Sequence, residues 1–168
     1  RAVMDLNIKT IISSPIEHHA VIHAIENLNN ISYNNVSLTK DGSVDLEHLE
    51  KLLSENNDLK LVSLMHVNNE IGNILDLKKV GDLCKKNNAY FHTDAVQGIG
   101  HFEIDLTELS IDFLSAAAHK FHGPKGVGFL FIKKNSGLKG LIHGGQQERG
   151  LRAGTEAVHN IVGMQLAM

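Results

Sequence analysis

The stretch that decides the fold runs from residue 59 to residue 92 and reads LKLVSLMHVNNEIGNILDLKKVGDLCKKNNAYFH. It opens with a nearly continuous apolar run, Leu59 to His66, which is typical of a strand buried on both faces of a sheet. Asp76 is a suitable helix cap, and apolar residues recur at helical spacing to about Asn87. A second buried strand follows at residues 89–92. This alternation predicts an α/β fold with a mostly parallel sheet.

The same alternation continues on both sides of that stretch. Further strands are expected at residues 10–13, 35–38, 111–116 and 128–132. Helices are expected at residues 19–28 and 46–53, and the start of another at residues 160–168. Strands without polar alternation need cover on both faces, so the sequence predicts a three-layer α/β/α arrangement.

Composition narrows the class of protein. The 168 residues suffice for one domain, and 42 % hydrophobic with 21 % charged residues is ordinary for a globular chain. The net charge of -3, the scattered basic residues and the absence of tryptophan argue against a nucleic-acid or anionic membrane partner. No apolar run matches a membrane span and no signal peptide opens the chain, so a cytoplasmic location is expected. The single cysteine, Cys84, excludes an internal disulfide and a cysteine-based zinc site.

Polar clusters follow three successive strands of the predicted sheet. His66 to Glu70 follows the first, His92 to Gln97 the second, and Ala118 to Lys120 the third. Ligands of open α/β sheets bind beyond the carboxyl ends of the strands. We therefore expect one edge of the sheet to carry the side chains of Asn69, Asp94, Gln97, His119 and Lys120.

This set of side chains suits pyridoxal phosphate (PLP) chemistry. A partly desolvated lysine such as Lys120 can attack a carbonyl group to form a Schiff base. An acid such as Asp94 can keep the pyridine nitrogen protonated, which makes the ring an electron sink. Amides such as Asn69 and Gln97 can bind the phenolic oxygen. Taken singly, an aspartate after a strand is more often a cap and a lysine is more often a surface charge, so the argument depends on the combination.

Five blocks of sequence, in order, resemble cysteine desulfurases, which are class V, fold-type I PLP enzymes. The blocks cover nearly the whole chain, and the last is closest to the NifS/IscS type. They are Glu17 to Val21, Met65 to Gly72, His92 to Gln97, Ala118 to Gly128, and His143 to Thr155. The resemblance implies that residues 1–168 are part of the large, PLP-binding domain of a homodimeric enzyme. It also implies removal of sulfur from L-cysteine to give L-alanine and an enzyme persulfide, which feeds an iron–sulfur scaffold or another sulfur acceptor such as the tRNA thiolation machinery.

The resemblance also implies a role for each matching residue. Lys120 would bind PLP covalently and later move protons, and Asp94 would pair with the pyridine nitrogen. Gln97 and Asn69 would bind the phenolic oxygen or nearby substrate groups, and His18 would stack on the ring. The phosphate would be bound by His119 and, from the partner subunit, by Thr155.

The sequence departs from the family pattern in several places. The family's catalytic cysteine and the arginine for the substrate carboxylate lie in a C-terminal region, and its phosphate loop precedes the part matched here. The chain is therefore expected to be a fragment, inactive alone. Cys84 shares an apolar helical face with Leu77 and Val80, so a structural role is expected for it. Ala117 stands where the NifS/IscS type has a phosphate-binding serine.

Three alternatives remain open from the sequence. Another class V PLP enzyme, a selenocysteine lyase or an aminotransferase, would share this core. A metal-binding module would use His18 and His19, or His119 and His122, but adjacent histidines on one helix point in different directions. A non-catalytic scaffold is disfavoured by the presence of the whole set of site residues, and no metal is expected.

Overall fold

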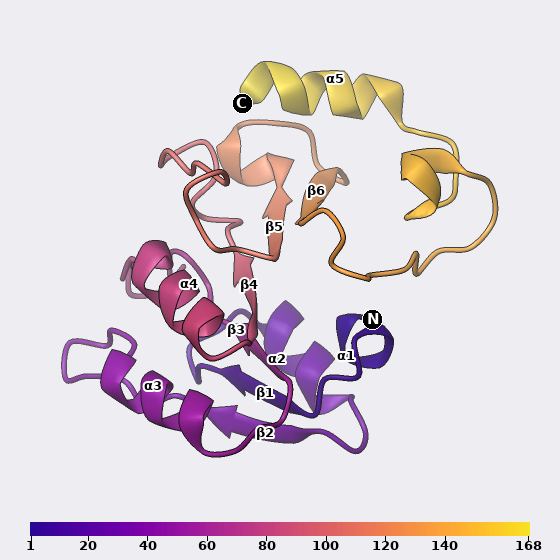
Figure 1. The fold of residues 1–168 in the computed structure, drawn as a ribbon. Coiled ribbons are helices and arrows are strands. Elements are labelled where there is room, and N and C mark those ends of the chain that lie inside the picture. The colour runs from indigo at the N-terminus through magenta and orange to yellow at the C-terminus, as the bar shows by residue number, and fades with distance from the viewer.

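The computed structural model describes residues 1–168 and shows one six-stranded sheet at the centre of the molecule (Figure 1). The strand order is β2-β1-β3-β4-β5-β6. The strands are β1 (Thr10–Ser13), β2 (Ser32–Asn35), β3 (Lys60–Ser63), β4 (Tyr90–Asp94), β5 (Phe113–Ala117) and β6 (Gly128–Ile132). All pairs from β2 to β5 are parallel, and β6 runs antiparallel to β5. The prediction of a mostly parallel sheet is confirmed.

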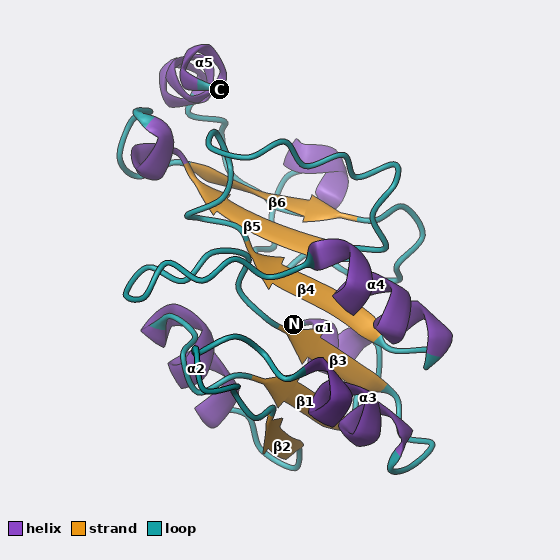
Figure 2. Ribbon diagram, turned by 90° about the vertical axis from the view of Figure 1, so that its left-hand side faces the viewer, coloured by secondary structure: helices purple, strands orange, loops and turns teal.

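Helices cover both faces of this sheet. Figure 2 shows α3 and α4 on one side and α1 and α2 on the other, while α5 lies beyond the β5–β6 edge. The helices are α1 (Ala2–Asp5), α2 (His19–Glu26), α3 (Leu46–Ser54), α4 (Leu77–Lys86) and α5 (Val158–Ala167), with short 3₁₀ helices η1 (Ala118–Phe121) and η2 (Gln147–Gly150). The three-layer α/β/α prediction is therefore confirmed. None of the helices combines the length and the apolar character that crossing a bilayer requires.

Two apolar cores fill the spaces between the layers. The larger core packs Leu49 of α3 and Val80 of α4 against Val62, Phe91 and the neighbouring strand residues. The smaller core packs Ile25 of α2 against the opposite face of the sheet. Every residue of β1 and β3 is buried, which fits strands covered on both faces.

Aspartates begin two of the helices in the way the sequence indicates. The side chain of Asp76 accepts a hydrogen bond from the backbone N–H of Lys79 at 3.0 Å. Asp45 accepts from the N–H groups of Glu47 and His48. Each carboxylate satisfies N–H groups that a helix start leaves without partners.

The strand predicted at residues 35–38 is wrong in position, because β2 spans Ser32–Asn35 and forms the edge of the sheet. Val36 still donates to the carbonyl of Ser13 at 2.8 Å, but Leu38 leaves the sheet and forms a bridge with Val44 around a turn. Val36 and Leu38 lie in this turn and against the core beside it. The residues of β2 are mostly polar, so their composition gives little indication of a strand.

The strand expected at residues 59–66 is shorter than predicted, since β3 covers Lys60–Ser63. Its pairing with β4 nevertheless continues, because the N–H groups of Leu64 and His66 donate to the carbonyls of His92 and Asp94 at 3.2 and 2.9 Å. The backbone is therefore well ordered up to the edge where the polar clusters lie.

Candidate active site at the carboxyl edge of the sheet

The parallel strands bring most of the predicted site residues to one edge of the sheet. Asp94 is the last residue of β4, and Lys120 lies in η1 directly after the neighbouring β5. His18 follows β1 and begins α2. Because β1, β3, β4 and β5 run in the same direction, their carboxyl ends and the residues after them share one edge.

Asp94 is buried and held on one side only. Its Oδ1 accepts a hydrogen bond from the N–H of Val96 at 2.9 Å, and its backbone carbonyl accepts from His66. Oδ2 receives no hydrogen bond from the protein. A buried carboxylate with one free oxygen suits a cationic or N–H donor from a ligand, as a protonated pyridine nitrogen would provide.

Lys120 and His119 are exposed on η1, not in a loop. The Lys120 carbonyl lies 3.2 Å from Nε2 of His101, a contact that ties η1 to the segment after β4. The Lys120 ammonium group forms none of the five salt bridges of the structure. His122 ends η1 in the left-handed conformation, at φ 67°. Lys120 is therefore exposed in this chain, rather than partly desolvated as expected from the sequence, and its side chain has no acidic partner.

Gln97 is half-buried in the turn that follows Asp94, and this turn is packed tightly. A Cβ atom added at Gly98 would lie only 2.1 Å from Nδ1 of His66. His66 is buried, packs edge-on against Phe102 at 5.5 Å, and leaves Nδ1 without a partner. Burial lowers the pKa of His66, so a neutral imidazole supports the turn that carries Gln97.

His18 is exposed and also caps α2. Its Nδ1 accepts a hydrogen bond from the N–H of Ala20 at 3.1 Å. This bond fixes the orientation of the ring at the start of α2.

Asn69 and Thr155 form no hydrogen bond with the other candidate site residues. Asn69 is exposed and donates to Oε1 of Glu70 at 2.7 Å, whereas the neighbouring Asn68 is buried and donates to the Ile16 carbonyl at 2.7 Å. Thr155 is exposed in the loop after η2 and forms no hydrogen bond with the other candidates. Their predicted roles stay predictions.

A chain of polar side chains crosses the sheet beneath Asp94, and sequence reasoning missed it. Oγ of Ser63 lies 2.8 Å from Nδ1 of His92, and Nε2 of His92 lies 3.3 Å from Oγ of Ser115. Burial lowers the pKa of His92 to about 4, and the negative charge of Asp94 opposes this only in part. His92 is therefore a neutral bridge between three adjacent strands.

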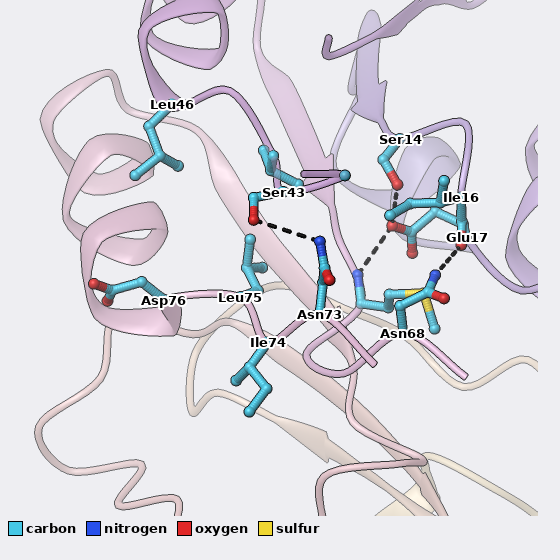
Figure 3. Close-up of a pocket in the computed structure, with 13 residues that line it drawn as sticks. Ser14, Ile16, Glu17, Ser43, Leu46, Asn68, Asn73, Ile74, Leu75 and Asp76 are labelled. Carbon is cyan, nitrogen blue, oxygen red and sulfur yellow. Dashed lines mark hydrogen bonds between the residues drawn. The ribbon is translucent and has the colours of Figure 1, made fainter. Parts of the chain in front are cut away.

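Glu17 is the second residue that the sequence did not single out for a role of its own. It lines a pocket of about 160 Å³ together with Ser14, Asn68 and other residues (Figure 3). Only 5 % of Glu17 is exposed, and its Oε2 has no hydrogen-bond partner. The pattern Ser14-x-x-Glu17 resembles a capping box, but it precedes α2 and its two side chains bond to each other, so it gave no usable signal.

The histidines do not form a metal centre of the usual kind. His19 and His23 stack on the exposed side of α2 with ring centroids 5.0 Å apart. No group of three or more histidine, cysteine, aspartate or glutamate side chains is placed to hold a metal ion.

Comparisons with known proteins agree with this geometry. The model of the family described as aminotransferase class-V matches residues 7–168. A cysteine desulfurase IscS from Clostridium botulinum is 48 % identical over 160 residues, which are 94 % of this chain and 40 % of that protein. The IscS of Methanosarcina thermophila is also 48 % identical, over 93 % of this chain and 39 % of its own length. The chain thus spans about 40 % of the length of these curated relatives.

Solved structures show the same similarity in three dimensions. A NifS-like protein superposes with a TM-score of 0.92 at 43 % identity, covering 99 % of this chain and 47 % of that chain. A NifS-like protein from Rickettsia africae gives a TM-score of 0.86 at 38 % identity, covering 96 % and 44 %. SspA, solved in complex with cysteine, gives 0.89 at 34 % identity, covering 96 % and 47 %.

Proposed function

Since the chain belongs to the aminotransferase class-V family, we propose that it is the cofactor-binding core of a PLP-dependent cysteine desulfurase. The observation that carries the proposal is the placement of Asp94 and Lys120 at one edge of the sheet, at the end of β4 and directly after the neighbouring β5. The names and the identity of the curated relatives support it. The whole protein would convert L-cysteine to L-alanine.

The residues at the edge of the sheet fit PLP. When bound, PLP supplies an electron sink that stabilises negative charge on the substrate carbon. Asp94 would accept the pyridine N–H through its free Oδ2, and Lys120 would hold the cofactor covalently and later move a proton. His18 would cover one face of the ring, and Gln97 and Asn69 would bind its phenolic oxygen or nearby substrate groups. His119 would bind the phosphate.

The proposed reaction balances without an external oxidant. A cysteine thiol of the enzyme would lose its proton and attack the substrate sulfur to form an S–S bond. The C–S bond of L-cysteine would break in the same step, with its electron pair left on carbon, which takes up a proton. The products are L-alanine and a persulfide, which a scaffold for iron–sulfur clusters or another acceptor would receive. Thr155, exposed on its loop, would reach the phosphate in the partner subunit of a homodimer.

The experiment that tests the function uses the whole protein with PLP, L-cysteine and a thiol reductant. We expect alanine and sulfide in equal amounts. Formation of a keto acid with transfer of the amino group would identify an aminotransferase instead. Turnover of L-selenocysteine without turnover of L-cysteine would identify a selenocysteine lyase.

Ala117→Ser is expected to strengthen PLP binding. Residue 117 ends β5 directly before η1, and it is half-buried beside the place proposed for the phosphate. A hydroxyl group there would add a hydrogen bond to a charged oxygen, worth about 1.5–3 kcal/mol or roughly tenfold or more in Kd. Titration of PLP followed by its visible absorbance measures the change. Ala116→Ser, on the opposite face of the same strand, is the control and should bring no gain.

Cys84 is expected to be inert. It is 1 % exposed in the larger core, and burial, helped by the nearby Asp112, raises the pKa of its thiol. A thiol kept protonated is a poor sulfur acceptor. Residues 1–168 alone should therefore release no sulfide from L-cysteine, and Cys84→Ala should leave the desulfuration rate of the whole protein unchanged. Sulfide release by the isolated chain, lost on this substitution, would contradict the expectation.

A further inference from the structure

Glu17 is a buried acid that the proposed chemistry does not use. It lies in the turn between β1 and α2 and is 5 % exposed. Burial of an ionisable side chain is costly, so its presence here calls for a physical reason. The residue that follows it is His18, which begins α2.

The carboxyl group of Glu17 joins two segments of the site. Its Oε1 accepts a hydrogen bond from Oγ of Ser14 at 2.6 Å and another from the backbone N–H of Met65 at 3.1 Å. Ser14 follows β1 and Met65 follows β3, so the bonds bind the turn after one strand to the end of the next (Figure 3). Asn68 adds a second tie through the carbonyl of Ile16.

These ties determine where His18 stands. The backbone before His18 is held by Glu17 and Ile16, and the ring is held by the N–H of Ala20. His18 is the candidate site residue adjacent to Glu17 in the chain, so we expect a change at Glu17 to act on it most directly.

The electrostatic surroundings of Glu17 contain no cation. Asp94 of β4 and Tyr33 of β2 are the titratable groups that interact with it. Burial raises the pKa of Glu17 to about 7, the two hydrogen bonds lower it in part, and the charge of Asp94 raises it further. When the group ionises, Oε2 becomes a buried charge without a donor. The adjacent pocket of about 160 Å³ has room for water that would hydrate this oxygen.

We propose that Glu17 is a positioning residue, whose neutral carboxyl group locks the His18 turn onto the end of β3. Ionisation strengthens each bond at Oε1 but leaves a buried charge on Oε2 without a donor, and the movement of this oxygen toward water in the pocket loosens the lock. The role of His18 toward PLP rests on the proposed function, whereas the lock itself depends only on the contacts of Glu17.

The lock is tested first without cofactor, by NMR of the backbone amides between pH 5 and 9. In the wild type, the Met65 amide should show a transition near neutral pH, and the Ala20 amide should share it. Glu17→Gln should keep the bonds at Oε1 and abolish the transition at Met65. Glu26→Gln, an exposed change on α2, should leave it in place. A transition that persists in Glu17→Gln, or that never occurs in the wild type, would overturn the proposal.

A double-mutant cycle tests whether Glu17 acts through His18. Glu17→Ala should weaken PLP binding about three- to tenfold, the worth of one or two hydrogen bonds, but have no such effect in a His18→Ala background. Additive effects would overturn the positioning role. If Glu17→Ala does not fold, the cycle is run with Glu17→Gln above pH 8, where the wild type is ionised and the variant should bind PLP more tightly. PLP binding that depends on neither Lys120 nor His18 would refute the proposed function. The NMR result would still stand, because it is measured without cofactor.

Discussion

Replacing Lys120 by alanine is expected to lower L-cysteine desulfuration by the whole protein by roughly 10²–10⁴-fold or more, the contribution of a positioned proton-transfer group. The covalent attachment to PLP that we propose for Lys120 would be lost as well, which adds to this effect. The visible absorbance that depends on this attachment should disappear in the same variant. Absorbance titration and sulfide release measure both effects.

Lys125→Ala is the matched control for this substitution. Lys125 is exposed in the turn after η1 and forms no salt bridge, so the control removes one positive charge from the same segment. It should keep near wild-type desulfuration. Equal losses in the two variants would point to a general electrostatic effect and would remove Lys120 from its assigned role.

Lowering the pH is expected to reduce the free energy of unfolding by about 3 kcal/mol through His92 alone. Its pKa falls from 6.5 to about 4 on folding, and one unit corresponds to about 1.4 kcal/mol. Below pH 6.5 the unfolded chain takes up a proton that the folded protein refuses. The stability that the neutral imidazole contributes is therefore complete above pH 6.5 and is lost as the pH falls toward 4.

Glu17 changes the free energy of unfolding in the opposite direction over nearly the same pH range. Its pKa rises from 4.5 to about 7 on folding, so the folded protein holds a proton that the unfolded chain loses. Its contribution is complete below pH 4.5 and is lost as the pH rises toward 7, again about 3 kcal/mol. The two residues should nearly cancel between pH 4.5 and 6.5.

Urea unfolding at a series of pH values separates the two contributions. His92→Gln should remove the contribution of His92. The free energy of unfolding of this variant should then fall with rising pH between pH 4.5 and 6.5, by close to 3 kcal/mol relative to the wild type. Glu17→Gln should give the reverse slope. Burial also lowers the pKa of His66, but this residue is unchanged in both variants. Parallel stability curves for wild type and His92→Gln would show that His92 does not titrate differently in the two states.

The sequence predicted those features that depend on local patterns. The apolar runs of β3 and β4 and the cap at Asp76 were sufficient for the α/β fold, because burial on both faces leaves a clear periodicity. The edge strand β2 was misplaced, since its polar residues Ser32–Asn35 pack against only one neighbouring strand. A strand of that kind is specified by its partner rather than by its own composition.

The site was predictable to the extent that order along the chain determines position. Asp94 and Lys120 follow neighbouring parallel strands and so had to share an edge. Three features depend on tertiary packing and were not predicted: the side-chain contacts of His92 with Ser63 and Ser115, the burial of Asn68 rather than Asn69, and the unpaired oxygen of Glu17. Adjacent identical amides differ only in which side of the backbone faces the interior.

The strand order has a consequence for the way in which the protein acquires its structure. From β4 onward, each strand pairs with the strand that precedes it in the chain, so the sheet then grows in one direction only. β2 alone lies on the far side of β1, and the sheet cannot extend until β3 has returned to pair with β1. We expect β1, β2 and β3, with the helices between them, to form the kinetic nucleus, and the later strands to add in turn as the ribosome delivers them. Lys120 would then enter its position after the edge that receives it has already formed.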